Sequence, residues 1–407
     1  MNTVSLVSPE CAPAKHERSV SQYNYSIGYL RAFLIAMVVA FHSALAYHPF
    51  APPLPASMAA VPAWWQVIPV VDTQRGMWAA ILTGVNDIFR MALLFFISGL
   101  FVSRAVKRKG AVRFLRSRLL RLGIPFLVAV ALAPLGYYPA YLQMAGHAGP
   151  RSYIRQWLRL SNWPAGPAWF LWVLLAFDSI AVILFLVSPN WAEELGRFIS
   201  RAIRYPARYF AVLAAISALL YVPLVVVLDS MRWINYGPFA FQPTRILYYL
   251  AYFLIGISVG AWGLERGLIA SDGKLAQSWY VWVLTALVVL AVSAAGTMMA
   301  LRDGQVVTRS WEVSMLSAGS CAATCFALLA LFTRFVRSRF RVTDSLSANS
   351  YGIYLFHYGF VIWLQYALLG FHLSAIAKFG LVFIGALSLS WGSAIQLRRI
   401  PIVARII

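Results

Sequence analysis

Apolar stretches of about 20 residues recur along the whole chain, separated by short polar segments. A helix needs about 20 apolar residues to cross the hydrocarbon core of a bilayer. Ten stretches meet this length, near residues 27–48, 78–103, 122–142, 167–188, 209–228, 244–263, 278–300, 312–333, 349–370 and 374–394. The pattern predicts an all-α integral membrane protein of about ten transmembrane helices. Residues 27–394 would form one membrane domain between tails at 1–26 and 395–407.

The composition agrees with this interpretation. Hydrophobic residues make up 61% of the 407 positions and charged residues only 12%, whereas about a quarter of a soluble protein is charged. A net charge of +21 would suggest a nucleic-acid partner in a soluble chain. Here the basic residues fall in short loops between apolar stretches, where they set orientation and meet anionic membrane lipids. We therefore expect no nucleic-acid role.

The distribution of lysine and arginine predicts the topology. If both termini are cytoplasmic, the inner segments carry 23 of these residues and the outer segments only 8. This asymmetry predicts that both termini are cytoplasmic, and we expect a multi-pass protein of the cell inner (plasma) membrane. The first 26 residues lack the apolar core of a signal peptide, in agreement with a cytoplasmic amino terminus. The three cysteines, Cys11, Cys321 and Cys325, form no metal-binding or redox pattern, and no metal site is expected.

Two polar residues interrupt the first apolar stretch. Arg31 and His42 are eleven residues apart, which places them on nearly the same helix face, about 16 Å apart along the axis. Ionisable groups inside a membrane are costly and often functional. The alternative is an arginine that reaches lipid phosphates and a histidine bonded to a neighbouring helix. On the expected topology Arg31 lies near the inner face and His42 towards the outer one.

A second polar stripe appears in the ninth stretch. Ser350, Tyr354 and His357 stand at i, i+4 and i+7, so they share a helix face that must meet other protein or a cavity. It forms a second line of polar groups to set opposite the first. A purely structural hydrogen-bond network is the alternative.

Other polar groups lie in or beside the apolar stretches. Asp87 and Arg90 are three apart and can neutralise each other, which we favour over a catalytic carboxylate. Ser98 and Gly99 would allow close backbone approach. Asp178 has no local partner, and Glu312 is similarly ambiguous.

The segment from Arg104 to Arg121 is the most basic in the chain. Apolar residues between its arginines predict an amphipathic helix on the inner surface that continues into the third span. Binding of anionic lipid is one interpretation. The other is a phosphate clamp, because Arg118 and Arg121 are three apart on one face.

Two outer segments are rich in aromatic residues. The first runs from His48 through several prolines to Trp64 and Trp65; we interpret it as a connector at the membrane interface, with a cap over an outer pocket as the alternative. The second, from Asp229 to Arg245, is aromatic enough to touch a sugar or a lipid.

The order of these motifs resembles the acyltransferase-3 family of integral membrane acyltransferases. The motifs that carry the resemblance are Arg31 with His42, Phe95-Phe96-x-Ser98-Gly99, Arg118-x-x-Arg121 before Pro125, Trp169-Phe170-Leu171-Trp172, and Ser350-Tyr351-Gly352-x-Tyr354-Leu355-Phe356-His357. Tyr29-Leu-Arg31 and Phe96-Ile-Ser-Gly-Leu-Phe101 look most like the branch that includes glucan succinyltransferases.

The resemblance implies transfer of an acetyl or succinyl group from cytoplasmic acyl-coenzyme A to a hydroxyl of an extracytoplasmic glycan or glycolipid. Acyl-coenzyme A would be a donor substrate, with no permanently bound cofactor. On this hypothesis Arg31, Arg118 and Arg121 hold its phosphates at the inner face. His42 would act as general base or as an acyl carrier, and Tyr354 and His357 would complete the catalytic site.

One position departs from the family pattern. An acidic residue often follows the first-span histidine, but here Tyr47 and His48 stand there. The partner of His42 is therefore open, with Asp72, Asp87 and Glu312 as candidates.

Two other functions fit the same residues. A transporter or exporter of an envelope glycan or lipid-linked intermediate would use the polar stripe as a substrate or proton path, although no inverted repeat or central Gly-Pro break is apparent. A non-catalytic partner in an envelope glycan complex is the third hypothesis.

Overall fold

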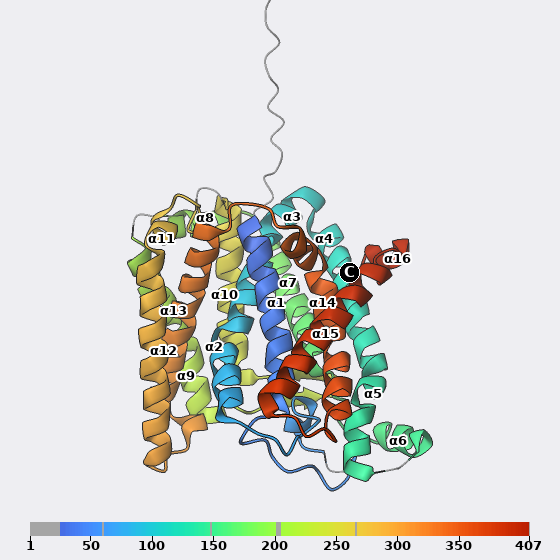
Figure 1. The fold of residues 1–407 in the computed structure, drawn as a ribbon. Coiled ribbons are helices and arrows are strands. Elements are labelled where there is room, and N and C mark those ends of the chain that lie inside the picture. Colours follow the sequence, from blue (N-terminus) through green and yellow to red (C-terminus); the bar gives the residue numbers. More distant parts are fainter. Residues whose placement is uncertain (1–24, 59–60, 147–148, 201–204, 265–266, 407) are drawn as a thin grey trace, which may run out of the picture.

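The computed structural model describes residues 25–58, 61–146, 149–200, 205–264 and 267–406. Within this part, ten long helices form one bundle (Figure 1). They are α1 (Tyr25–Leu45), α2 (Met77–Gly99), α5 (Ile124–Ala145), α7 (Trp169–Val187), α9 (Pro206–Leu228), α10 (Pro243–Trp262), α12 (Trp279–Arg302), α13 (Trp311–Phe335), α14 (Arg341–Ala367) and α15 (Ala375–Leu397). The predicted tail 1–26 and Cys11 lie almost entirely outside the described residues.

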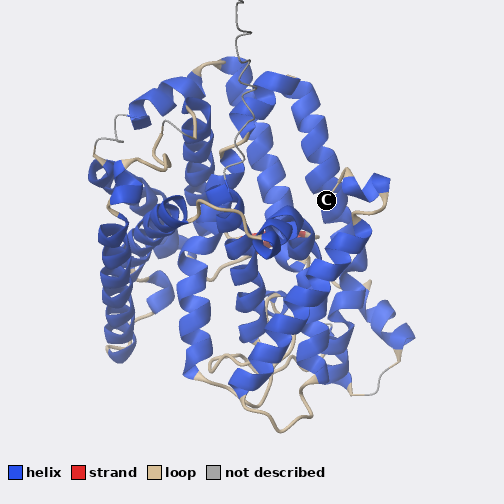
Figure 2. Cartoon of the chain, turned by 45° about the horizontal axis from the view of Figure 1, so that its top comes forward, coloured by secondary structure: helices blue, strands red, loops and turns tan. Residues whose placement is uncertain are grey.

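Shorter elements connect the long helices. Figure 2 shows how little of the described chain is strand: one antiparallel pair, β1 and β2, between α9 and α10. The short elements are η2 (Ala63–Gln66), α3 (Val102–Lys109), α4 (Ala111–Arg118), the wide π-helical turn η3 (Leu119–Gly123), α6 (Pro150–Trp157), η4 (Gly166–Ala168), α8 (Trp191–Ser200), β1 (Ile234–Tyr236), β2 (Phe239–Phe241), α11 (Lys274–Gln277), η6 (Val307–Arg309) and α16 (Pro401–Ala404).

Nine of the long helices in the described part are long and apolar enough to cross a membrane. The tenth, α14, has the length, but its tyrosines, histidine and glutamine make it less apolar. The prediction of an all-α membrane protein is therefore confirmed, with every expected span present as a helix. The count of ten crossings stays a prediction because it depends on α14.

Local sequence explains where many helices begin. Pro150, Pro206 and Pro243 each stand in a first helical turn, where the missing N–H has no intrahelical partner to lose. Ser310 and Ser374 cap α13 and α15 by accepting a hydrogen bond from the backbone N–H three residues on, which satisfies a donor the helix leaves free.

The most buried helices lie at the centre of the bundle. We compare the most apolar 18-residue window of each span. In the span that contains α2, 72% of these residues are buried, and in α1 67% are buried, whereas in α12 only 17% are. Because lipid covers the outer helices, their exposed apolar residues are expected. The polar residues of α1 and α14 therefore lie in the interior or against other protein.

Glycine permits the closest helix contact in the bundle. A Cβ placed on Gly99 of α2 would lie 2.2 Å from the Phe253 carbonyl of α10, and one on Gly260 would lie 1.9 Å from the Leu100 carbonyl. Gly256 and Gly260 form a Gly-x-x-x-Gly pair, the spacing that lets two membrane helices touch through their backbones. The close approach predicted at Ser98-Gly99 is confirmed.

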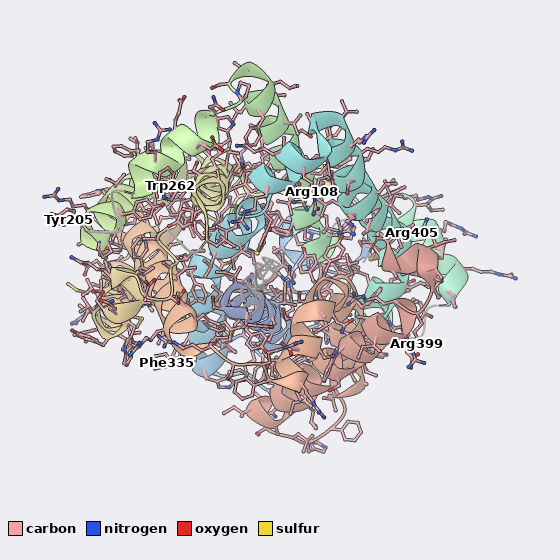
Figure 3. All side chains as sticks on the ribbon, turned by 90° about the horizontal axis from the view of Figure 1, so that it is seen from above. Arg108, Tyr205, Trp262, Phe335, Arg399 and Arg405 are labelled. Carbon is pink, nitrogen blue, oxygen red and sulfur yellow. The ribbon has the colours of Figure 1, made fainter. Side chains whose placement is uncertain are left out.

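Basic residues gather on one face of the bundle, which we call the basic face. It carries α3, α4, α8 and α11, and α6 lies at the opposite end (Figure 1). Looking onto this face, Figure 3 labels Arg108, Arg399 and Arg405, with Trp262 and Phe335 at the ends of α10 and α13. Its assignment to the cytoplasm stays a prediction.

The amphipathic segment 104–121 differs from the single helix expected. It breaks at Gly110, whose φ of +77° is a left-handed conformation suited to glycine. α3 and α4 therefore meet at a corner, and only α4 continues through η3 into α5.

The glycine contact generates a stability prediction. We expect Gly260→Ala to lower the thermal unfolding temperature in detergent, because forcing a methyl group against a backbone carbonyl costs about 1–3 kcal/mol or more. The control is Gly392→Ala in α15, where nothing lies within 4 Å of the new Cβ and alanine favours helix. Equal unfolding temperatures for Gly260→Ala and the wild type would contradict the contact.

Candidate functional site

A line of polar contacts joins α1 to α14. Towards the basic face, Arg31 Nη2 donates a hydrogen bond to the Ser347 carbonyl at 3.1 Å. About three turns further along both helices, the rings of His42 and His357 lie 5.4 Å apart. Since both contacts occur at nearly the same sequence offset, the helices run parallel and in register. The two polar stripes inferred from the sequence face each other.

The two histidines differ in burial and in bonding. His357 is fully buried, and its Nδ1–H donates to the Tyr354 carbonyl at 2.7 Å. This bond places the proton on Nδ1, so Nε2 keeps a lone pair. Nε2 has no hydrogen-bond partner among the described residues. His42 is only partly buried. Its ring meets Tyr358 edge-on, with centroids 4.8 Å apart.

Side chains from α2 and α14 hold the segment around His42. Gln365 Nε2 donates to the carbonyls of His42 at 2.9 Å and Ser43 at 3.2 Å, which lie in the last turn of α1, where carbonyls lack intrahelical donors. The Arg90 guanidinium lies 4.1 Å from the centre of the Phe41 ring, a cation–π distance. The backbone that carries the His42 ring is therefore held from two sides.

Asp87 pairs with two arginines. Its carboxylate lies 2.7 Å from Arg245 Nη1 of α10 and 3.9 Å from Arg90 Nη2. The pairing of Asp87 with Arg90, predicted from their spacing, is present. The shorter contact is the one to Arg245, which no local spacing could reveal because the two residues are on different helices.

Arg118 supplies the partner that Asp178 lacks in the local sequence. Arg118 Nε lies 3.2 Å from Asp178 Oδ2, and the Asp178 side chain is completely buried in α7. A buried carboxylate beside a cation avoids much of the cost of an isolated charge. The Arg118 guanidinium is thus already paired with a carboxylate inside the protein.

Arg121 stands in the wide turn η3, just before α5. Pro125 has no N–H to donate to the Arg121 carbonyl four residues earlier, and Tyr351 of α14 donates to that carbonyl instead. Arg121 Nε donates to the Arg405 carbonyl at 3.2 Å. Arg118 and Arg121 therefore make separate contacts, and the phosphate clamp between them stays a prediction.

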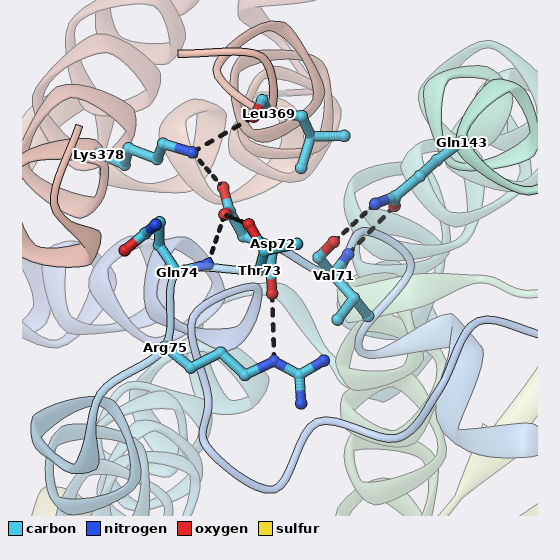
Figure 4. A network of polar contacts seen from close by, with 8 residues as sticks. All are labelled: Val71, Asp72, Thr73, Gln74, Arg75, Gln143, Leu369 and Lys378. Carbon is cyan, nitrogen blue, oxygen red and sulfur yellow. Dashed lines mark hydrogen bonds and ion pairs between the residues drawn. The ribbon is translucent and has the colours of Figure 1, made fainter. Parts of the chain in front are cut away.

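The segment between α1 and α2, at the end of the bundle opposite the basic face, is anchored to the helices (Figure 4). Lys378 of α15 and Asp72 form a fully buried ion pair at 2.7 Å. Gln143 of α5 bonds both the N–H and the carbonyl of Val71, at 3.2 and 2.6 Å. The sequence favours a connector here, but the structure shows a cap packed on the helices, because its backbone and charge are paired with α5 and α15.

Residues of the cap line a partly open cavity of about 120 Å³. Trp65 and Gln66 of the cap are both buried and line it together with the turn before η4 and Asn235 of β1. The Gln66 carbonyl accepts hydrogen bonds from the hydroxyls of Tyr137 and Tyr358, each at 2.6 Å. Tyr358 therefore stands between this cavity and His42.

The three acidic candidates for the partner of His42 bond elsewhere. Asp72 pairs with Lys378, Asp87 with Arg245, and Glu312 accepts a hydrogen bond from Ser310 Oγ at 2.7 Å. His48, where the family pattern has an acid, accepts a hydrogen bond from the Phe50 N–H at 3.2 Å, and burial lowers the pKa of its imidazole. The neighbours of the His42 ring are instead the imidazole of His357 and the phenol ring of Tyr358.

One known family model matches nearly the whole chain. The model of the acyltransferase-3 family, described as an acyltransferase domain, matches residues 24–395. The chain belongs to the acyltransferase-3 family. The resemblance noted in its motifs is confirmed over nearly the whole chain, including every helix that contacts the histidine pair.

Curated relatives of this acyltransferase-3 member are named glucans biosynthesis protein C. The protein from Salmonella gallinarum is 25% identical over 256 residues, covering 57% of each chain. The one from Escherichia coli O6:K15:H31 is 23% identical over 252 residues, 58% of each chain, and the one from Salmonella paratyphi B is 28% identical over 166 residues, 40% of this chain and 35% of its own. The match thus spans somewhat more than half the length of the first two relatives and about a third of the third. No solved structure matches.

The structure groups the six predicted site residues of this acyltransferase-3 member into two regions. His42, Tyr354 and His357 lie together, whereas Arg31, Arg118 and Arg121 contact three different segments closer to the basic face. Their roles in catalysis and donor binding stay predictions.

Sequence reasoning missed several residues around the histidines. Gln365, a polar residue in the apolar part of α14, was an available signal. The only indication of a role for Tyr358 in the sequence was its neighbour His357. Nothing in the sequence indicated Trp65 or Gln66, because only folding brings the cap to α14.

The buried ion pair generates a prediction for this acyltransferase-3 member. We expect Lys378→Met to lower the free energy of unfolding by about 3–5 kcal/mol, because it leaves the Asp72 carboxylate buried without its cation. Lys378→Met combined with Asp72→Asn should recover part of the loss. Thermal unfolding and limited proteolysis of the cap would measure both, with Lys109→Met, at an exposed lysine, as control. A cap as resistant in Lys378→Met as in the wild type would contradict the anchoring role.

Proposed function

We propose that this protein is an O-acyltransferase of the inner membrane. It transfers an acetyl or succinyl group from cytoplasmic acyl-coenzyme A to a hydroxyl of an extracytoplasmic glycan or glycolipid. The observation that carries the proposal is the pair of facing imidazoles, His42 and His357, at the end of the α1 and α14 contact line remote from the basic face. Membership of the acyltransferase-3 family supports the reaction class.

The position of the arginines supports a donor that enters from the basic face. Arg31 and His42 lie on one face of α1, about 16 Å apart along its axis, and the pantetheine arm of coenzyme A has a similar length. A phosphate group held near Arg31, Arg118 and Arg121 would leave the thioester within reach of His42. Guanidinium groups suit this role because they form charge-assisted hydrogen bonds with phosphate.

His42 is the residue we assign to proton transfer. Its imidazole takes the proton of the acceptor hydroxyl while the hydroxyl oxygen attacks the thioester carbon. The new C–O bond forms, the C–S bond breaks, and the coenzyme A thiolate leaves and takes up a proton. The alternative route forms an acyl-histidine first, which the acceptor then attacks. In both routes His357 and Tyr358 position the His42 ring.

The names of the relatives support a glucan as acceptor. They are called glucans biosynthesis protein C, and the cavity under the cap lies on the side of the bundle opposite the basic face, where such an acceptor would arrive. The mass added to envelope glycans in cells with the protein, compared with cells without it, identifies the acyl group and the acceptor.

The role of His42 is tested by substitution. We expect His42→Ala to reduce acyl transfer from labelled acyl-coenzyme A to a glycan extract by about 10²–10⁴-fold, the usual contribution of a general base. Membranes that carry the variant at wild-type levels provide the measurement.

The matched control is His372→Ala, which changes an exposed histidine in the turn before α15 and should transfer at the wild-type rate. More than a few per cent residual transfer by His42→Ala would remove His42 from the central role. Glycan movement across the membrane without consumption of acyl-coenzyme A would favour the exporter hypothesis.

Donor binding generates a separate prediction. We expect Arg118→Ala with Arg121→Ala to raise the apparent KM for acyl-coenzyme A about tenfold or more, since a hydrogen bond to a charged group contributes about 1.5–3 kcal/mol. Arg113→Ala, at an exposed arginine of α4, is the control. An unchanged KM would return the pair to lipid binding.

A further inference from the structure

The cavity beneath the cap is built from three segments that are distant in sequence. Its lining residues are Val61, Pro62, Trp65 and Gln66 of the cap, Leu160, Ser161, Asn162, Trp163 and Pro164 before η4, and Asn235 of β1. Its volume of about 120 Å³ far exceeds the roughly 10–15 Å³ that one water requires. The cavity therefore has room for a ring-sized group.

Three buried polar atoms on residues that line this cavity have no hydrogen-bond partner in the described part of the protein. They are Trp65 Nε1, Gln66 Nε2 and Asn235 Oδ1, and the side chains of Trp65 and Gln66 are only 1% and 7% exposed. A buried polar group without a hydrogen bond is strongly unfavourable. Two donors and one acceptor on residues that line the same cavity match a ligand with several hydroxyl groups, because each hydroxyl both donates and accepts.

The charge of the cavity excludes an anionic ligand. Every lining residue that the structure describes is neutral, whereas phosphate and carboxylate groups are bound by arginine, lysine or helix amino termini. Trp163, which is 39% exposed, is also a lining residue, and its indole is a large apolar surface. Neutral polar groups beside an aromatic face suit the hydroxyls and C–H face of a sugar.

A short series of contacts joins one residue of the cavity to the histidine pair. The Gln66 carbonyl accepts from the Tyr358 hydroxyl at 2.6 Å, and the Tyr358 ring lies 4.8 Å from the ring of His42. On another wall, Tyr354 donates to the Pro167 carbonyl, three residues after Pro164. Both walls are thus bonded to the helix that carries His357.

We propose that this cavity is a subsite for one neutral sugar residue of the acceptor, bound through Trp65, Gln66, Trp163 and Asn235. The subsite rests on the proposed function for its role, because it holds the acceptor while a neighbouring hydroxyl reaches His42. Its ability to bind sugar does not depend on catalysis.

Binding is tested on the purified full chain in detergent by saturation-transfer NMR. The probes are the neutral disaccharides cellobiose, lactose and mannobiose, with glucose 6-phosphate as the charged comparison. We expect at least one neutral disaccharide to bind, and Gln66→Leu or Asn235→Ala to weaken its binding about tenfold, which corresponds to about 1.4 kcal/mol. Because Gln66 Nε2 and Asn235 Oδ1 have no partner within the described protein, both variants should unfold near the wild-type temperature.

Two further variants separate the subsite from the catalytic proposal. Trp163→Ala should weaken sugar binding, while Trp311→Ala, at an exposed tryptophan at the start of α13, should not. His42→Ala should bind the disaccharide as the wild type does although it transfers no acyl group.

The outcomes for the two proposals differ. Wild-type sugar affinity in Gln66→Leu, Asn235→Ala and Trp163→Ala would overturn the subsite and leave the transferase proposal standing. Failure of all three neutral disaccharides to bind, or equal binding of glucose 6-phosphate at the cavity, would also overturn it. Sugar binding lost in these three variants, in a protein that transfers no acyl group, would support the subsite and contradict the transferase.

Discussion

The polar face of α14 is the constraint on which the rest of the bundle depends. Lipid cannot hydrogen-bond a carbonyl, hydroxyl or imidazole, so a helix with these groups at membrane depth must be surrounded by protein. Each part of the face has its own partner: Ser347 accepts from α1, Tyr351 donates to η3, and Tyr358 donates to the cap. These contacts set the positions of α1, α5 and the cap relative to one another, and they place the two histidines together.

The two ends of the bundle have opposite chemical character. The basic face carries most of the lysines and arginines, including Arg121 with its guanidinium against the carboxyl-terminal segment. The cavity under the cap at the other end is lined by neutral side chains. A substrate pair with one anionic member and one neutral, hydroxyl-rich member matches this separation, with the histidines between the two ends. The buried Asp72–Lys378 pair holds the neutral end closed over α15.

The accuracy of each prediction follows the range of the interaction behind it. The approach of helices at Gly99 was predictable because a small residue allows it whatever the partner. The contact of Asp178 with Arg118 was not, since a carboxylate can pair with a cation on any neighbouring helix. The packing of the cap on the helices was not predictable for the same reason, because its anchors, Gln143 and Lys378, lie far along the chain.

What the sequence determined by itself was the set of helices, the side of the bundle that each loop occupies and the face of each helix that is polar. These properties follow from local length, charge and periodicity, which act within a few turns of chain. Only the tertiary structure decided which polar faces meet: that His42 lies against His357 and Tyr358, and that Gln66 and Asn235 share a cavity. The physical reason is that buried polar groups select partners by geometry in space, and beyond a single helix the distance in sequence carries no information about that geometry.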